Sequence, residues 1–208
     1  MRSRYVAERL GSFLGKIAYS YARYGYHWYA LREIPDGKDL DAVDEKLLTS
    51  YGVTYQHMRR RRRREEGWAN VAYVRYRRWF VLMGTTGRHE SFTRICRKHL
   101  LEEPLYFGGY IVALHGGEVT VLVSPRRWKR IRELAHRIAL HNEAKVFHFF
   151  HTWLHGKVAP FSFPGVMKQK NTLLAEVNTR RRVAGLPTIP PLVRRTYERK
   201  GRHEDIQV

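Results

Sequence analysis

Six consecutive arginines in the first third of the chain restrict its fold more than any other feature of the sequence. Arginine stays charged at any relevant pH, so neighbouring side chains of this run repel one another. In a helix they would point in all directions, and no single buried face would account for them. The run therefore predicts a surface segment, either solvated or held against a polyanion. Its members are Arg59, Arg60, Arg61, Arg62, Arg63 and Arg64.

The whole chain carries a large excess of positive charge. It has 39 lysines and arginines against 19 aspartates and glutamates in 208 residues, which gives a formal net charge of +20. A compact domain with this charge repels itself unless a polyanion lies nearby, which indicates DNA, RNA or an anionic membrane as the partner. Hydrophobic residues make up 43% of the chain, enough for a folded core rather than a disordered basic tail.

The membrane is the weaker of these partners. The apolar runs are short, such as residues 71–74 and 119–123, whereas a membrane-spanning helix needs about 18–20 apolar residues. Residues 1–17 also lack the apolar stretch of a secretory signal. Cys96 is the single cysteine, which excludes an intramolecular disulfide and favours a reducing compartment. We therefore expect no membrane contact, and a soluble protein of the cytoplasm or nucleoid, or of the nucleus in a eukaryote.

Further basic clusters predict that phosphate binding extends beyond the arginine run. Arginine suits phosphate because its planar guanidinium donates paired hydrogen bonds. One cluster, Arg75, Arg77 and Arg78, belongs to a pair of expected strands. Another lies in the first turns of a helix expected to begin at Ser124-Pro125, where the helix dipole disfavours cations, so its charge needs a reason other than helix stability. This second cluster consists of Arg126, Arg127, Lys129 and Arg130.

Two aromatic residues beside these arginines suggest a surface on which bases stack. On the strand expected over residues 71–76, Tyr73 and Arg75 point to the same face, and Trp79 follows the turn. Sheet faces that carry tyrosine, arginine and tryptophan bind single-stranded RNA or DNA by stacking. The alternative is that this aromatic face is simply core, and the sequence leaves both interpretations open.

The order of the expected elements predicts an α+β fold. We expect a mostly antiparallel sheet with helices packed on one face, similar to a ferredoxin-like or RRM-like core with an extra hairpin and flanking N- and C-terminal helices. The predicted strands are 26–34, 71–76, 79–84, 109–114 and 119–124, and the predicted helices are 5–24, 39–51, 90–101, 125–154 and 166–184. The expected domains are an N-terminal helix (1–25), a nucleic-acid-binding core (26–156), a C-terminal helix on or beside it (157–187) and a basic tail (188–208).

An enzyme is the alternative interpretation. Five acids cluster at the start of the helix expected over 39–51, where two carboxylates could hold Mg²⁺ for phosphodiester cleavage. The simpler explanation is that the acids complement the helix dipole and that Asp39 caps the helix. Four histidines of the long helix share one face and are candidate ligands for zinc or another metal, although no HExxH motif accompanies them. The acids are Asp36, Asp39, Asp41, Asp44 and Glu45, and the histidines are His141, His148, His151 and His155.

No family signature is present in the sequence. The element order is similar to that of rolling-circle or Y1-transposase nucleases, but the strand at 118–121 lacks their histidine pair and the helix after it contains no tyrosine. We therefore expect a nucleic-acid-binding protein without a cofactor, serving as a non-catalytic accessory subunit among protein partners in a ribonucleoprotein or mobile-element complex. The alternative is a metal-dependent nuclease or transposase. The sequence does not distinguish DNA from RNA, or single from double strands.

Overall fold

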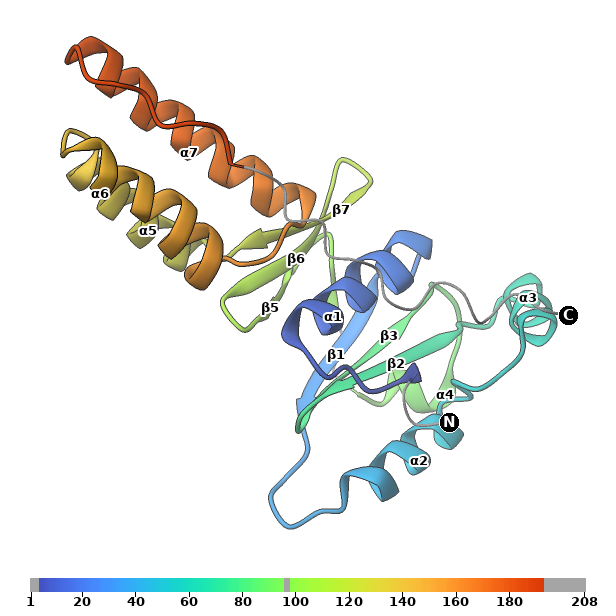
Figure 1. Cartoon of the computed structure of the whole chain (residues 1–208). Coiled ribbons are helices and arrows are strands. Elements are labelled where there is room, and N and C mark those ends of the chain that lie inside the picture. The colour runs from blue at the N-terminus through green and yellow to red at the C-terminus, as the bar shows by residue number, and fades with distance from the viewer. Residues whose placement is uncertain (1–3, 96–97, 193–208) are drawn as a thin grey trace, which may run out of the picture. The chain divides into compact units, whose positions relative to one another are not determined.

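The computed structural model describes residues 4–95 and 98–192 of the chain. The chain divides into two compact units, Met1–Val121 and Leu122–Val208, so the boundary falls inside the range 26–156 that was expected to be one core. Antiparallel sheets and helices packed against them confirm the α+β class (Figure 1). Cys96 and most of the expected tail, 188–208, lie outside the described residues.

The first unit is built on a four-stranded antiparallel sheet with the order β2-β3-β1-β4. Strands β2 and β3 have the bounds that were predicted from their runs of apolar and aromatic residues, and Arg77 takes a positive φ of 55° in the tight turn between them. Strand β1 pairs with β3 over its whole length. The strands are β1 (Trp28–Glu33), β2 (Val71–Tyr76), β3 (Trp79–Gly84) and β4 (Lys98–His99).

Helices cover both faces of this sheet, whereas the sequence predicted helices on one face. Leu47 and Leu48 of α2 pack with Phe92 of α4 on the face that carries Tyr73 and Leu82. On the opposite face, Phe13 of α1 contacts the ring of Tyr76. Figure 1 shows α1 and α2 on either side of the sheet. The helical segments of this unit are α1 (Leu10–Gly15), η2 (Lys16–Tyr21), η3 (Ala22–Tyr24), α2 (Leu40–Ser50), α3 (His57–Glu65) and α4 (Glu90–Thr93).

The hairpin expected to extend the same sheet belongs instead to a second, three-stranded sheet with the order β5-β6-β7. Its turn contains Gly116 and Gly117, both with the positive φ that a tight hairpin requires. Phe107 of β5 packs edge-on against Phe13 and Trp79 and so joins this sheet to the first. The strands are β5 (Leu105–Phe107), β6 (Tyr110–His115) and β7 (Glu118–Val123), of which β5 was not predicted. The helix expected over 90–101 is also wrong in its second half, because α4 ends at Thr93 and residues 98–99 form β4.

The second unit is helical. The long helix expected over 125–154 is interrupted at Asn142, whose side chain accepts a hydrogen bond from the Lys145 N–H and so starts a new helix. Lys170 and Arg181 of α7 are fully buried, and Arg181 donates to the carbonyls of Ala139 and His141 at the end of α5. The helices are α5 (Pro125–Ile138), α6 (Glu143–Phe147), the π-helical η4 (His148–Val158) and α7 (Pro164–Val183).

A buried ion pair joins α2 to the sheet of the first unit. Arg75 of β2 is 6% exposed and donates to both carboxylate oxygens of Asp44, through Nε and Nη2, each at 2.8 Å from the nearer oxygen. The Tyr73 hydroxyl donates to the same carboxylate. Burial and this hydrogen bond raise the pKa of Tyr73. The three side chains fix how α2 lies on the sheet.

Asp44→Ala is expected to lower the free energy of unfolding by about 3–5 kcal/mol, because it leaves a guanidinium buried without its main carboxylate. Asp36→Ala is the matched control, because Asp36 pairs with Arg78 at the fully exposed surface and its removal is expected to change stability little. Urea unfolding followed by circular dichroism measures both. Equal stability of the two variants would contradict the assigned role of Asp44.

Alkaline pH is expected to destabilise the first unit. Burial raises the pKa of Tyr21 to about 12, and its hydroxyl donates to the carbonyl of Tyr73 at 3.0 Å. Since the unfolded tyrosine ionises near pH 10, the free energy of unfolding falls between pH 10 and 12, by up to about 1.4 kcal/mol per pH unit for this group. Unfolding of Tyr21→Phe measured against pH should show a shallower slope, and an unchanged slope would contradict the assignment.

Candidate nucleic-acid interface

One member of the arginine run fastens α3 to the first unit. Every side chain of α3 is exposed or half-buried, so burial of apolar residues does not hold this helix in place. Arg60 instead points inward and donates to the Tyr26 hydroxyl and the Tyr55 carbonyl, each at 2.9 Å, and to the carbonyl of Val53. Asn70 returns a hydrogen bond to the Arg60 carbonyl at 2.8 Å. Arg60 is therefore an anchor and does not face a ligand.

The end of α3 positions a tryptophan that the sequence did not single out. The Gly67 N–H donates to the Arg64 carbonyl and the Trp68 N–H to the Arg63 carbonyl, the paired bonds of a Schellman motif. Gly67 takes the positive φ of 77° that this motif needs. Trp68 then forms a parallel bridge with Arg88, in the loop after β3. Helix α3 thus begins after Tyr55 and ends before Trp68.

Three arginines lie over these two aromatic rings; Arg59 and Arg88 are exposed, and Arg63 is half-buried. The guanidinium of Arg59 lies 3.8 Å from the ring centre of Tyr55, and that of Arg63 lies 5.5 Å from both Tyr55 and Trp68. Arg88 lies 5.3 Å from the ring centre of Trp68. Cation–π contacts of this kind restrict the guanidinium groups without using their N–H groups. Arg63 also donates from Nη2 to the Ala69 carbonyl at 3.4 Å. We call the three arginines and the two aromatic residues the arginine–aromatic surface.

A glycine permits the close approach that brings Arg88 to Trp68. Gly87 has a φ of 133°, which favours glycine, and a Cβ there would lie 2.6 Å from the backbone nitrogen of Ala69. The Ala69 N–H donates to the Arg88 carbonyl at 2.8 Å, and the Arg88 N–H donates to the Gly67 carbonyl at 3.0 Å. The two segments are thereby locked side by side.

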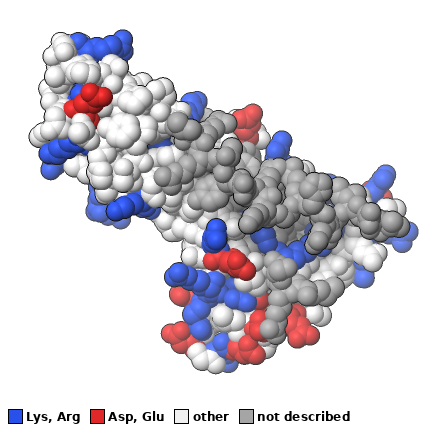
Figure 2. Space-filling view, in the orientation of Figure 1, with Lys and Arg blue, Asp and Glu red and all other residues white. Residues whose placement is uncertain are grey.

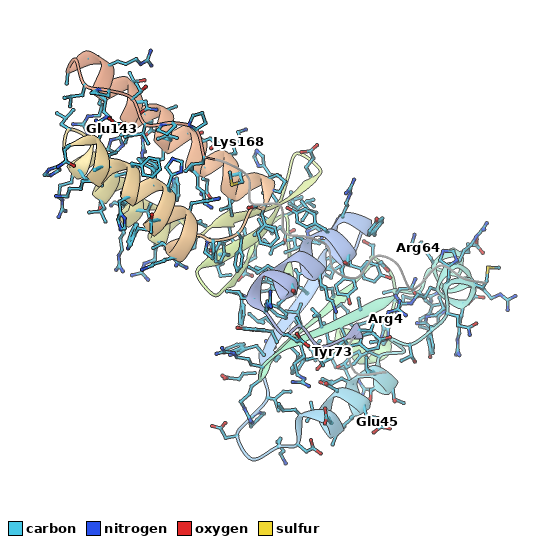
Figure 3. All side chains as sticks on the ribbon, viewed as in Figure 1. Arg4, Glu45, Arg64, Tyr73, Glu143 and Lys168 are labelled. Carbon is cyan, nitrogen blue, oxygen red and sulfur yellow. The ribbon has the colours of Figure 1, made fainter. Side chains whose placement is uncertain are left out.

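The remaining members of the run face solvent. Arg61 pairs with Glu65 at the surface, a contact that contributes little to stability. Arg62 and Arg64 are exposed, and within residues 4–95 and 98–192 neither has a hydrogen bond or ion pair to a carboxylate. Figure 2 shows lysine and arginine side chains along the edge where α3 lies, and acids together with further basic side chains around α2; Figure 3 labels Arg64 on α3.

The stacking surface expected on β2 and β3 is not exposed. Tyr73 and Arg75 are buried by α2. The aromatic face of this strand therefore belongs to the core, and neither residue is part of the candidate interface. Trp79 is half-buried against Phe107. Arg78 donates to the carbonyls of Ile34 and Pro35.

Arg77 is the exposed member of this cluster, and its guanidinium lies 5.3 Å from the ring centre of Tyr76. It remains a candidate for phosphate contact.

The basic cluster of the second unit lies on the first turns of α5, as expected. Arg126, Lys129 and Arg130 are exposed. Arg127 is half-buried and donates from Nη2 to the Val158 carbonyl at 2.6 Å, so it ties the start of α5 to the end of η4. Farther along the helix, Arg132 pairs with Glu176 of α7.

Four of the five acids proposed as metal ligands have structural partners, among them Asp41, which lies 3.8 Å from Arg75. Asp39 caps α2 by accepting from the Asp41 N–H at 2.9 Å, which confirms the capping interpretation. Asp44 pairs with Arg75, and Asp36 with Arg78, while Glu45 is exposed.

The four histidines also have different surroundings. His155 is buried with its Nδ1 3.0 Å from the Lys170 ammonium, His151 stacks on Phe147, and His141 and His148 are exposed. Among the described residues, no three histidine, cysteine or carboxylate side chains come together as metal ligands would.

Comparison with known proteins does not assign the chain to a family. No protein-family model matches the sequence, and no curated protein matches it at a significant level. In the part of the chain that the structure covers, no helix is both long and apolar enough to cross a bilayer.

Sequence patterns indicated the basic clusters but did not reveal Tyr55, Trp68 and Arg88 as part of one surface. The available signal was the placement of one aromatic residue on each side of the arginine run, with Gly67 as a helix stop. Arg88 carried no such signal, because the bridge that brings it to Trp68 joins segments on opposite sides of the β2–β3 hairpin.

Arg60→Met is expected to lower the free energy of unfolding by about 2–3 kcal/mol, because it leaves buried carbonyl groups without their charged donor. It should also speed amide hydrogen exchange in α3. Arg62→Met removes the same charge from the exposed side of the helix and is expected to leave both measurements unchanged. Equal behaviour of the two variants would contradict the anchoring role.

Proposed function

We propose that this protein binds nucleic acid through phosphate groups held on the arginine–aromatic surface. The observation that carries the proposal is the row of guanidinium groups stacked on Tyr55 and Trp68. Among the described residues, none of Arg59, Arg63 and Arg88 is paired with a carboxylate. Charges concentrated in this way repel one another, and a polyanion relieves the repulsion.

The geometry of the surface favours a phosphodiester chain over other polyanions. A stacked guanidinium keeps a fixed plane, and this plane suits paired hydrogen bonds to phosphate oxygens. Tyr55 and Trp68 are half-buried and add aromatic rings of the kind that single strands bind by stacking. Arg62 and Arg64 are exposed on α3 between these rings, and Arg77 is exposed elsewhere in the same unit. These three arginines supply further phosphate contacts.

The strand order of the first unit supports a finer assignment of its fold. The sheet β2-β3-β1-β4 is antiparallel and is crossed by helices after β1 and β3, which is the arrangement of a ferredoxin-like core. We propose this topology for the unit and keep the function separate from it, because many unrelated activities use the same scaffold.

The proposed role is that of an accessory subunit without catalysis of its own, in a ribonucleoprotein or mobile-element complex of the cytoplasm, nucleoid or nucleus. Partner proteins would then carry the chemistry. The support for this role is that the acids of the first unit serve its own fold: Asp39 caps α2 and Asp44 binds Arg75.

Binding is expected to weaken steeply with salt, because each neutralised phosphate releases counterions. Fluorescence anisotropy with a labelled oligonucleotide at several KCl concentrations measures the slope of log affinity against log salt. The double variant Arg59→Gln/Arg63→Gln should lower the magnitude of this slope by about 0.7–0.9 for each phosphate that it no longer neutralises.

The control Arg23→Gln/Arg32→Gln removes two exposed arginines of the same unit outside the arginine–aromatic surface. It is expected to change the slope less. A nearly flat slope for the unaltered protein would overturn the proposed function, and equal effects of the two double variants would overturn the assigned surface.

A further inference from the structure

A groove lined by basic and apolar side chains lies in the second unit, between the start of α5 and η4. Its volume is about 640 Å³, within the range of sites that hold a small organic ligand. Three arginines of α5 line it beside apolar side chains of α5 and η4. The lining includes Arg126, Arg127, Arg130, Ile131, Leu134 and Trp153.

The positive charge of the groove is not neutralised by its own lining. Arg126 and Arg130 lie one helical turn apart and are exposed, and no carboxylate is among the described residues that form the groove. Arg127 holds the wall together through its hydrogen bond to the Val158 carbonyl. A smaller hollow of about 270 Å³ elsewhere on α5 differs, because its Arg132 is paired with Glu176.

The lining of the groove contains an aromatic ring that already takes part in a stack. Trp153 is half-buried, and its ring lies 5.0 Å from that of Phe149 at an angle of 28°. Trp153 is one of the residues that line the groove. Aromatic rings beside arginines are the combination that holds the bases and phosphates of single strands.

We propose that this groove holds one nucleotide of a single-stranded nucleic acid, with its phosphate on Arg126 and Arg130 and its base against Trp153. The inference rests on the proposed function and deepens it by naming the form of nucleic acid. A paired base in a duplex is stacked on its neighbours and is not free to enter the groove, so the site favours single strands.

The test compares a single-stranded oligonucleotide with a blunt duplex of the same length, using the full chain and fluorescence anisotropy. Arg126→Gln/Arg130→Gln is expected to weaken single-strand binding by about tenfold or more and to affect duplex binding much less. The control Lys129→Gln/Arg137→Gln removes two exposed charges of the same helix outside the groove. This control should lower the affinity for the single strand and for the duplex by similar small factors.

A second readout reports on the base itself. The fluorescence of 2-aminopurine in a single strand should be quenched on binding by stacking on Trp153, and Trp153→Leu should abolish the quenching and weaken binding about fivefold to a hundredfold. Because Trp153 is partly buried, its replacement could unfold the unit, and the surface variants decide the outcome in that case.

The test distinguishes a wrong assignment of the groove from a wrong proposed function. If the full chain binds neither oligonucleotide, both are overturned. If it binds, but the groove variant and its control reduce single-strand and duplex affinity alike, only the groove assignment is overturned.

Discussion

A guanidinium group that leaves water must find hydrogen-bond acceptors, and this requirement organises both units. Arg75 joins β2 to α2 through Asp44, Arg60 joins α3 to Tyr26 just before β1, and Arg181 joins α7 to the residues that follow α5. Each of these side chains reaches acceptors far away in the sequence, so each links elements that the chain itself separates. Removing such a donor leaves polar groups buried and unpaired, which is more damaging than removing an exposed ion pair.

Local patterns in the sequence predicted most of the helices and strands, but not that helices cover both faces of the first sheet. Short runs of apolar and aromatic residues predicted β2 and β3 with their observed bounds, and the Gly-Gly pair predicted the turn between β6 and β7. The strand with Tyr73 was open to two interpretations because arginine usually marks a solvent face. Its partner Asp44 lies 31 positions earlier, so only the folded chain shows that Arg75 is buried. Strands as short as β4 contain too few residues to show the two-residue period of a strand.

The candidate site was also predicted only in part from the sequence. Composition and clustering pointed to the run and to the start of α5, and both places carry exposed cations in the structure. The sequence could not tell that Arg60 differs from its neighbours, because six identical residues contain no information about which one points inward. It also gave no hint of the groove, which forms only when η4 packs beside α5. One residue type therefore fills structural and ligand-facing roles side by side.

The two rings of the arginine–aromatic surface flank α3, and the number of arginines between them fixes their relative orientation. An α-helix turns by about 100° for each residue. A run longer or shorter by a single arginine would swing Trp68 around the helix axis and carry Arg63 away from one of its two rings. The overall charge would hardly change. The length of the run therefore determines where the two rings lie around α3, and this matters to the surface as much as the charge of the run does.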